Sequence, residues 1–352
     1  MTLCAHFGVC GGCTRQNLSA EAYRDHKRDM VAKALARAGL GDVAVKDPVL
    51  SPQKSRRRAV FKFGKEKTHF AVGFHAARSH AIVDMRECLV LTKGLFGLAA
   101  VLRRGLAPIL AEGEKGEVHV CETDTGLDLA FRWRRKLTPA LTAAIAKAFT
   151  GADIARVVFN GEIVLERAKP QIMFDGVAVT PPPHAFLQAT REGQAVLQSH
   201  VLALTQGAKM VADLFAGIGT FSLPLARHAK VHAVEQDSEA LTALLEAVRK
   251  ARGLKPVTTE KRDLFKTPLT ARELSQFDAV VLDPPRAGAA AQMRQLAAAK
   301  IPCIAYVSCD ASSFARDAAI LVKANFQMGD VTPVDQFLYS DHIELVAGFT
   351  RL

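Results

Sequence analysis

The sequence lacks the features of a membrane or exported protein. Its 352 residues include no apolar run of about 18 residues, which is the length that a membrane-spanning helix needs. No signal peptide precedes the cysteine-rich segment that begins at Cys4. Low-complexity stretches and internal repeats are also missing, and 49% of the residues are hydrophobic. We therefore expect a folded, cytoplasmic protein that makes no membrane contact, and nothing implies an obligate protein partner.

Acidic residues are scarce in the N-terminal third of the chain. Residues 1–110 hold 8 Asp and Glu against 19 Lys and Arg, whereas residues 111–352 hold 27 of each kind. The whole net charge of +11 therefore lies in the first third, where Arg56, Arg57 and Arg58 are consecutive. A basic domain beside a neutral one is typical of proteins that bind a phosphate backbone, so we expect this run to contact a nucleic acid. Solubilising surface charge is the alternative, and charge alone does not separate the two.

Cysteine is sparse, and its pattern is informative. The chain has seven cysteines, an odd number, and in a reducing compartment they serve metal binding or catalysis more often than disulfides. Cys4, Cys10, Cys13 and the distant Cys88 form a set of four thiols, which by number suits Zn²⁺ and an iron–sulfur cluster equally. Their spacing differs from the paired CxxC motifs of a zinc ribbon and therefore favours the cluster.

The predicted secondary structure follows one pattern before residue 181 and another after it. A helix predicted over 19–38 and the short strands that follow indicate a small α+β domain, which ends at the three prolines 181–183. Beyond them, strands alternate with helices, which predicts a doubly wound parallel sheet with its ligand site at the carboxyl ends of the strands. The predicted domains are thus 1–180 and 181–352. In the second, parallel strands are expected at 209–215, 230–235, 278–282 and 302–307, and an antiparallel pair within 326–350.

The segment 210–226 has the pattern of a nucleotide-binding strand, turn and helix. Gly217 and Gly219 let the backbone approach a ligand, and the helix that follows offers free N–H groups. A dinucleotide site would have a third glycine where this chain has Ser222. Glu235 ends the next strand, where it suits the two hydroxyls of a ribose, and Asp263 follows the strand after that, where it suits an adenine edge. This combination favours S-adenosylmethionine over a dinucleotide.

An acidic turn and a cysteine follow two later strands of the predicted sheet. Asp283 precedes two prolines and then Arg286, which stands where amino-group methyltransferases have an aromatic residue that stacks a base. Cys309 ends the following strand at the same edge of the sheet, and we interpret it as a nucleophile. Cys303, at the other end of that strand, is interpreted as a buried structural cysteine.

A thiolate at this edge has a clear chemical task. C5 of uracil is a weak nucleophile, and addition of a thiolate to C6 makes an enolate whose C5 can attack a methyl sulfonium. A base must then remove the proton from C5. Glu344, between Ile343 and Leu345, is the candidate, because partial desolvation raises the pKa of a carboxyl. A solvated strand acid is the alternative interpretation of Glu344.

Together these residues resemble the iron–sulfur branch of the RNA uracil-5-methyltransferase family, whose members modify 23S ribosomal RNA. The resemblance covers nearly the whole chain. It rests on CAHFGVCGGC at 4–13 with Cys88, Phe-Leu-Gln at 186–188, DLFAGIGTF at 213–221, Glu235, Asp263, DPPRAG at 283–288, YVSC at 306–309 and His342-x-Glu344.

The resemblance implies a fold, cofactors and residue roles. The fold is a Rossmann-like class I methyltransferase domain preceded by a smaller α+β iron–sulfur domain, in a short form without the N-terminal β-barrel RNA-binding domain of many relatives. The activity is that of an S-adenosylmethionine-dependent 23S rRNA (uracil-C5)-methyltransferase, with Cys309 as the nucleophile and Glu344 as the base. The implied cofactor-binding residues are Gln188, Phe215, Gly217, Gly219, Thr220, Glu235, Asp263 and Asp283, and the implied [4Fe-4S] ligands are Cys4, Cys10, Cys13 and Cys88.

Departures from the family pattern keep two alternatives open. Asp310-Ala311 stands where the family has Asn-Pro, and Leu338 stands where a proline follows the phenylalanine. An acid next to the nucleophile is expected to raise the pKa of its thiol. One alternative is tRNA uracil-5 methylation, although tRNA members generally lack the four cysteines. The other is a catalytically weak RNA-binding member, which the intact Cys309 and Glu344 argue against.

Overall fold

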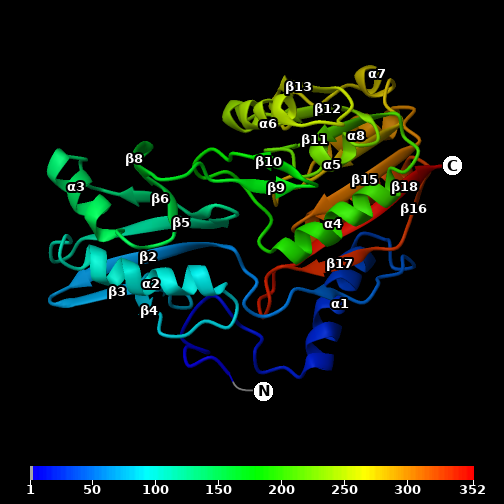
Figure 1. Ribbon diagram of the computed structural model, residues 1–352. Coiled ribbons are helices and arrows are strands. Elements are labelled where there is room, and N and C mark those ends of the chain that lie inside the picture. The colour runs from blue at the N-terminus through cyan, green and yellow to red at the C-terminus, as the bar shows by residue number, and fades with distance from the viewer. Residues whose placement is uncertain (1–2) are drawn as a thin grey trace.

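In the computed structural model, which describes residues 3–352, the chain forms two lobes, each built around its own β-sheet (Figure 1). Side-chain caps define the starts of most of the longer helices; the Ser19 hydroxyl, for example, accepts a hydrogen bond from the Ala22 N–H at the start of α1. The helices are α1 (Ala20–Arg37), α2 (Lys93–Leu106), α3 (Pro139–Ala148), α4 (Arg191–Leu204), α5 (Ser222–Leu225), α6 (Ser238–Lys250), α7 (Ala271–Leu274), α8 (Ala290–Ala298) and α9 (Ala311–Lys323).

The first lobe is a seven-stranded sheet with helices on one face. Its order is β4-β3-β2-β5-β6-β7-β8, and every neighbouring pair is antiparallel except β6 and β7. One apolar core joins this sheet to α2 and α3 and includes Phe61, Leu98 and Ile145. The strands are β2 (Arg58–Glu66), β3 (His69–His75), β4 (Ile82–Asp84), β5 (Lys115–Thr123), β6 (Gly126–Trp133), β7 (Ile154–Phe159) and β8 (Glu162–Glu166).

The second lobe contains the doubly wound sheet that the sequence predicts. Its order is β1-β17-β18-β15-β14-β11-β12-β13, with β16 paired to β18. The run from β15 to β13 is parallel, and β18 closes it in the antiparallel direction. The strands are β1 (Val49–Leu50), β11 (Met210–Leu214), β12 (Lys230–Glu235), β13 (Val257–Lys261), β14 (Ala279–Leu282), β15 (Cys303–Ser308), β16 (Phe326–Met328), β17 (Thr332–Asp335) and β18 (Glu344–Arg351).

The N-terminal helix belongs to the second lobe by its packing. Val31 and Leu35 of α1 lie in the same apolar core as Phe314 and Leu321 of α9. Strand β1 adds to the edge of the same sheet beside β17, and Figure 1 shows α1 next to β17. The sequence division at residue 180 misses this arrangement, because it groups residues 20–50 with the basic domain although they pack on the other sheet.

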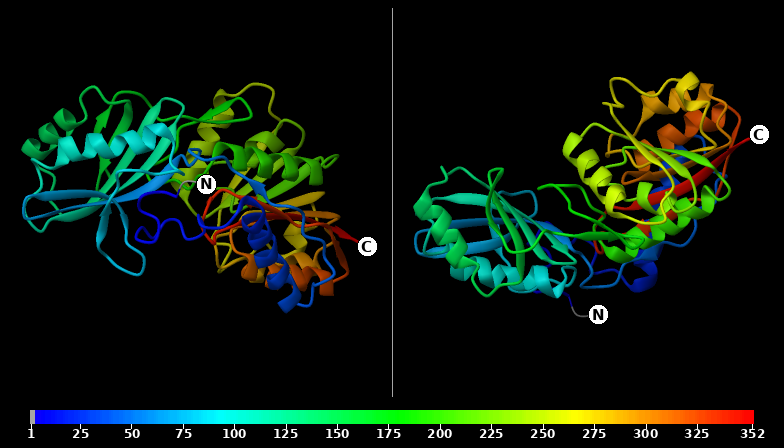
Figure 2. Two further views of the ribbon diagram at one scale, coloured as in Figure 1. Left: turned by 90° about the horizontal axis from the view of Figure 1, so that it is seen from below. Right: turned by 45° about the horizontal axis from the view of Figure 1, so that its top comes forward.

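The segment between the sheets ties the lobes together. Strands β9 (Ile172–Phe174) and β10 (Val177–Val179) form a hairpin whose core residues pack with those of α6. In Figure 2 this hairpin lies between the two lobes. The prolines at 181–183 follow it, and the carbonyl of Pro181 accepts a hydrogen bond from Arg156 of the first sheet at 2.9 Å.

Arg57 also joins the lobes, which contradicts its expected role in RNA contact. Its side chain is 1% exposed. The Nε atom donates to the carbonyl of Gln188 at 3.1 Å, and Nη2 donates to Oε1 of Gln194 at 2.6 Å. Alternation along a strand sends Arg57 into this interface and its neighbours Arg56 and Arg58 to the other side.

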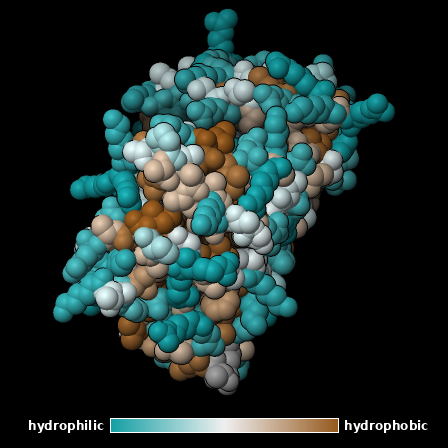
Figure 3. Space-filling model, turned by 60° about the vertical axis from the view of Figure 1, so that its left-hand side comes forward, coloured by the Kyte–Doolittle hydropathy of each residue, from teal (hydrophilic) through white to brown (hydrophobic). Residues whose placement is uncertain are grey.

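One face of the molecule (Figure 3) shows how polar and apolar side chains are distributed on the first lobe. In Figure 3, long hydrophilic side chains separate small apolar patches on the face of the first lobe. Among the large exposed apolar side chains are Phe186 and Phe265, which both line the cavity described below. No helix among residues 3–352 is both long enough and apolar enough to span a bilayer.

Candidate active site

A cavity of about 380 Å³ lies at the carboxyl ends of β11, β12, β14 and β15, where a doubly wound sheet binds its ligand. Residues far apart in the sequence meet here, because parallel strands end at the same edge. Of the predicted site residues, those that line the cavity are Phe215, Gly217, Thr220, Glu235, Asp283, Cys309 and Glu344.

The turn after β11 exposes its backbone to the cavity. Phe215 has φ +62° and Gly217 has φ +53°, and a Cβ added to Gly217 would meet no atom within 4 Å. Gly217 donates its N–H to Oε2 of Glu235 at 3.0 Å, while Oε1 of Glu235 accepts the N–H groups of the next two residues. A left-handed Phe is a strained conformation that functional sites often hold. Gly219 lies behind the cavity wall, where a Cβ would come within 2.5 Å of Leu244.

A buried carboxyl lies beneath this turn. Asp213 is fully buried at the end of β11 and accepts a hydrogen bond from the Ser222 hydroxyl at 2.5 Å. Its other oxygen has no hydrogen-bond partner among the described residues. Burial raises the pKa of Asp213 to about 7, and the nearby carboxyls of Asp283 and Glu235 add to the shift.

Gln188 lies behind the cavity wall and forms a hydrogen bond with Asp283, which lines the cavity. Its Nε2 donates to Oδ2 of Asp283 at 3.0 Å, and its Oε1 accepts from Gln336 at 2.7 Å. Gln188 is 1% exposed and does not line the cavity. Burial raises the pKa of Asp283 to about 7, whereas the Gln188 hydrogen bond and the charge of Arg58 oppose this rise. Gln188 therefore positions a cofactor-pocket carboxyl, and its own contact with a cofactor stays a prediction.

Asp263 does not face this cavity, unlike the other acids of the predicted set. Its carboxylate accepts hydrogen bonds from the N–H groups of Phe265 at 3.0 Å and Lys266 at 3.3 Å. It borders a separate, open hollow, while Leu264 and Phe265 beside it line the cavity. Asp263 thus shapes the turn that presents Phe265, and its predicted contact with an adenine edge stays a prediction.

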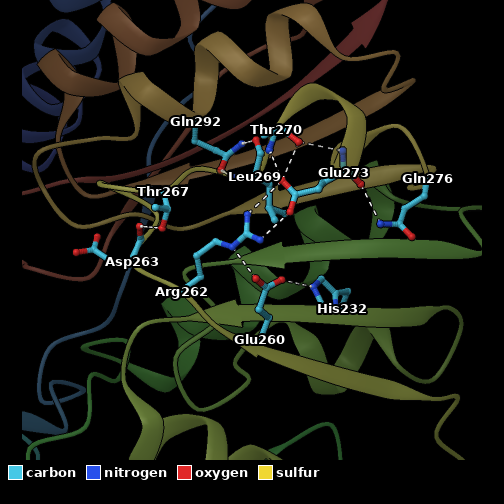
Figure 4. A network of polar contacts seen from close by, with 10 residues as sticks. All are labelled: His232, Glu260, Arg262, Asp263, Thr267, Leu269, Thr270, Glu273, Gln276 and Gln292. Atoms are coloured by element: carbon cyan, nitrogen blue, oxygen red, sulfur yellow. Dashed lines mark hydrogen bonds and ion pairs between the residues drawn. The ribbon is translucent and has the colours of Figure 1, made fainter.

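An ion-pair network anchors that turn (Figure 4). Arg262 donates to Glu260 at 2.6 Å and to both oxygens of Glu273 at 2.7 and 3.2 Å. Glu273 also accepts the N–H of Thr270 in a capping box at the start of α7, and Glu260 contacts His232 at 3.1 Å. The network fixes both ends of the loop that carries Leu264 and Phe265.

The thiol and the carboxyl proposed for catalysis enter the cavity from adjacent, antiparallel strands. Cys309 directly follows β15, and Glu344 begins β18, which pairs with β15. Glu344 is 2% exposed, so the alternative of a solvated strand acid is wrong. Burial raises the pKa of Glu344 to about 8, with a further rise from Asp283 and an opposing effect of Arg58. A carboxyl with this pKa gains its unprotonated form, and with it the ability to act as a base, as the pH rises past about 8.

The Cys309 thiol is harder to ionise than a free cysteine, but Asp310 is not the cause. Burial raises the pKa of Cys309 to about 12, and the carboxyls of Glu344 and Asp283 add to this, whereas Arg286 opposes it. One oxygen of Asp310 caps α9 by accepting two N–H groups, and the other lies 3.5 Å from the guanidinium of Arg286. The capping role explains why an acid is accommodated next to the cysteine.

A buried network holds the loop that leads into Glu344. Lys27 of α1, fully buried, donates to Oδ1 of Asp335 at 3.0 Å and to the carbonyl of His342. Tyr23 donates to the other oxygen of Asp335 at 2.6 Å and accepts the N–H of Tyr339 at 2.7 Å. Helix α1, which the sequence placed in the other domain, therefore fixes the loop on which the predicted base depends.

The four cysteines of the predicted cluster lie around one pocket. Cys4, Cys10, Cys13 and Cys88 line a cavity of about 120 Å³, which Arg56 also borders. Burial raises the pKa of the Cys13 thiol to about 11, and the other three sulfurs add to this rise. Among residues 3–352, no three His, Cys, Asp or Glu side chains converge as a single metal ion requires. Metal ligation by these cysteines thus stays a prediction.

Two residues that shape the cavity, Arg262 and Phe265, were not among the residues expected from the sequence, whereas Phe186 begins the Phe-Leu-Gln motif noted there. Phe186 and Phe265 are 56% and 46% exposed and line it together with Arg262. Phe265 packs against Phe215 with ring centroids 5.5 Å apart. A phenylalanine two residues after Asp263 was the available signal, because an aromatic at a ligand-binding turn is a candidate for stacking.

The fold and the site define a Rossmann-like methyltransferase. The glycine turn after β11, the carboxyls of Glu235 and Asp283, and the thiol of Cys309 line one cavity. The sequence profile of the tRNA (Uracil-5-)-methyltransferase family matches residues 182–350. A protein of Rhizobium meliloti (strain 1021) that is named an uncharacterized RNA methyltransferase is 46% identical over 350 residues, which cover 98% of this chain and 84% of that protein. The chain therefore belongs to the uracil-5 RNA methyltransferase family, and it is an S-adenosylmethionine-dependent RNA methyltransferase.

Two further similarities refine this comparison. The 23S rRNA (uracil(1939)-C(5))-methyltransferase of Halomonas elongata is 33% identical over 372 residues, covering 97% of this chain and 74% of that protein. The crystal structure of Pyrococcus abyssi tRNA (uracil-54, C5)-methyltransferase in complex with S-adenosyl-L-homocysteine superposes with a TM-score of 0.74 at 23% identity, covering 97% of this chain and 86% of that one. The second similarity confirms the predicted fold.

Proposed function

We propose that this protein transfers a methyl group from S-adenosylmethionine to C5 of one uridine in 23S rRNA, through a covalent bond between Cys309 and C6. The observation that carries the proposal is the meeting of Cys309 and the buried Glu344 at one cavity with the glycine turn and Asp283. The 33% identity to a 23S rRNA methyltransferase supports the choice of RNA. The four cysteines support it as well, because they mark the rRNA branch that the sequence resembles.

The cavity fits S-adenosylmethionine in size and in the chemistry of its walls. Glu235, held by the Gly217 N–H, suits the ribose hydroxyls, and the open backbone at Gly217 allows close approach. Phe265 offers an aromatic face for adenine at the rim. Asp283, oriented by Gln188, is the acid available for the polar end of the cofactor. When bound, the cofactor supplies an electrophilic methyl group on sulfur.

The residues of this chain then carry the remaining chemistry. The Cys309 thiolate adds to C6 of uracil, and the C5–C6 double bond becomes an enolate that is nucleophilic at C5. C5 takes the methyl group, and the bond from that methyl to the cofactor sulfur breaks. Glu344, unprotonated, removes the proton from C5, after which the double bond re-forms and the S–C6 bond breaks. The buried position of Glu344 keeps water away from this proton transfer.

The RNA assignment is tested by mapping 5-methyluridine in a strain that lacks the gene. One uridine of 23S rRNA should lose its methyl group, and wild-type protein supplied from a plasmid should restore it. The level of 5-methyluridine in tRNA from the same strain should be unchanged. Loss of the modification from tRNA with an unchanged 23S rRNA would replace this proposal with the tRNA alternative. No change in either RNA would instead favour a catalytically weak RNA-binding member.

We also propose that Cys4, Cys10, Cys13 and Cys88 hold a [4Fe-4S] cluster. Four thiols around one pocket provide the ligand number of such a cluster. The Gly12 N–H points at the Cys10 sulfur at 3.5 Å, as is common for cluster ligands. The cluster has no step in methyl transfer and is assigned a structural role.

Replacement of Cys13 with serine should bleach the protein and loosen its N-terminal segment. Anaerobically purified wild-type protein should be brown and contain iron and sulfide, because thiolate-ligated iron–sulfur centres absorb visible light. The Cys13→Ser protein should lose colour and iron and melt at a lower temperature, since metal binding contributes to folding. Cys303→Ser, which lies on β15 away from the pocket, should stay brown. A colourless wild-type protein containing zinc would contradict the cluster.

A further inference from the structure

A second cavity, of about 300 Å³, lies beside the catalytic one and is not used by the chemistry above. Its floor is the face of the first sheet that α2 and α3 leave uncovered. Register shows this directly: Arg58 of β2 lies opposite Cys121 of β5, and Cys121 lies opposite Asp128 of β6. All three line the cavity, whereas Phe61 and its neighbours on the opposite face pack with the helices. The prolines and His184 of the segment after β10 form the other wall.

Arg58 lines this cavity without an ion-pair partner among residues 3–352, whereas Arg56 also borders the pocket of the four thiols. Among residues 3–352, neither Arg56 nor Arg58 forms an ion pair with a carboxylate, and the Arg58 guanidinium donates no hydrogen bond. The basic residues around them are paired, since Arg156 lies 2.7 Å from Asp128 and Lys62 contacts Glu117. A largely buried guanidinium without a partner is costly, so a free one that faces a cavity indicates an anionic ligand.

The Arg58 side chain also marks where the two cavities meet. Its guanidinium stacks on Phe186 with its carbon 4.4 Å from the ring centroid. Phe186 lines the catalytic cavity, while Arg58 lines the second one. The charge of Arg58 acts on both Asp283 and Glu344 and opposes the rise that burial causes in the pKa of each. The two cavities therefore adjoin at the contact between Arg58 and Phe186.

The walls of the second cavity suit a nucleotide in other respects. The rings of His119 and His184 lie 4.8 Å apart at nearly a right angle, and both border the cavity. Apolar side chains of Pro182 and Leu187 line the rest of the wall. Aromatic rings beside a cation form a surface on which a base stacks while its phosphate is neutralised.

We propose that this cavity is a subsite for the RNA nucleotide adjacent to the target uridine, and that Arg58 binds the phosphate that joins the two nucleotides. This inference rests on the proposed function. The uridine occupies the catalytic cavity, and its neighbour is held between the first sheet and the segment at 181–187. Binding at this subsite places the RNA chain across the junction of the two lobes. In this proposal Arg58 makes the RNA contact that was expected of all three arginines, and the buried Arg57 makes none.

The test is a double-mutant cycle between Arg58 and one phosphate. Binding is measured for wild-type protein and Arg58→Gln with a 23S rRNA fragment that contains the mapped uridine. Matched fragments carry a neutral methylphosphonate at the linkage on either side of that uridine. Arg58→Gln should weaken binding of the natural fragment about 10-fold and reduce its salt slope by about 0.7–0.9. One of the neutral linkages should weaken wild-type binding similarly and have no further effect in Arg58→Gln.

Controls separate the subsite from misfolding and from the activity itself. Arg58→Lys keeps the charge and should restore most of the salt slope, and Arg249→Gln, an exposed arginine on α6, should bind like the wild type. Thermal melting of each variant reports its folding. If both neutral linkages and Arg58→Gln have additive effects in an enzyme that methylates 23S rRNA, the subsite assignment is overturned. A wild-type protein that does not methylate 23S rRNA overturns the proposed function instead.

Discussion

Replacement of Cys309 with alanine should reduce methyl transfer to 23S rRNA to background. Without the thiol nothing adds to C6, and C5 of uracil is not nucleophilic enough to take the methyl group at a useful rate. The loss should appear in kcat with RNA affinity largely kept, because Cys309 is one small side chain on the wall of a large cavity. Transfer of labelled methyl groups from S-adenosylmethionine to RNA measures the rate, and RNA binding is measured separately.

The matched control for this variant is Cys303→Ala at the other end of β15. The Cys303 sulfur lies 3.1 Å from the carbonyl of Leu204 and faces away from the catalytic cavity. Cys303→Ala should keep most of the activity, which separates the chemistry of Cys309 from general disturbance of the strand. A Cys309→Ala protein that still methylates RNA would remove the nucleophile from its assigned position.

Replacement of Glu344 with glutamine should stop the reaction one stage later. Addition of Cys309 and methyl transfer do not need the carboxylate, but removal of the C5 proton does. A methylated RNA–protein adduct should therefore accumulate on ordinary uridine RNA, while product release falls by about 10²–10⁴-fold. Denaturing gels with labelled RNA show the adduct as a band of reduced mobility, which the Cys309→Ala, Glu344→Gln double variant should not form.

Glutamine matches the shape of Glu344, so the buried site should remain packed. Glu239→Gln, an exposed acid at the start of α6, controls for the loss of one negative charge and should turn over normally. Normal turnover by Glu344→Gln would move the base to another group. Asp283 is another carboxyl that lines the cavity and has a raised pKa, and it would be the next candidate.

Much of the second lobe could be predicted from the sequence, because local signals and topology agree there. The alternation of apolar strands with helices gave β11, β12, β14 and β15 to within a residue or two at each end. Parallel strands end at one edge, so acids and a cysteine that each follow such a strand were expected to meet. Cys309, Glu235 and Asp283 do line one cavity.

The contributions of distant segments could not be predicted, because they depend on packing across the chain. The helical pattern of α1 predicts a helix but does not show which sheet the helix covers. Lysine is usually a surface residue, and Lys27 is buried here because it pairs with Asp335, which is distant in the sequence. Arg56, Arg57 and Arg58 look alike in the sequence. Only the alternation of the strand and the position of Gln188 show that Arg57 is buried while Arg58 faces a cavity.

Asp263 shows a different limit of the sequence pattern. Its position after β13 agrees with a ligand-binding acid, yet its carboxylate is engaged by the backbone of its own turn. Short acidic side chains commonly bind nearby N–H groups in this way, and a single sequence does not distinguish the two uses. The residue that reaches the cavity from this turn is Phe265.

The central claim, a covalent bond from Cys309 to the target uridine, is tested most directly by mapping the trapped adduct. Wild-type protein is mixed with S-adenosylmethionine and a 23S rRNA fragment that carries 5-fluorouridine at the mapped position. Fluorine replaces the C5 proton that Glu344 would remove, so the intermediate cannot be released. The tryptic peptide 301–316 contains both Cys303 and Cys309, and fragmentation in the mass spectrometer distinguishes them. We predict a methylated fluorouracil nucleotide on Cys309; an adduct on another residue, or methylated RNA without any adduct, would contradict the account.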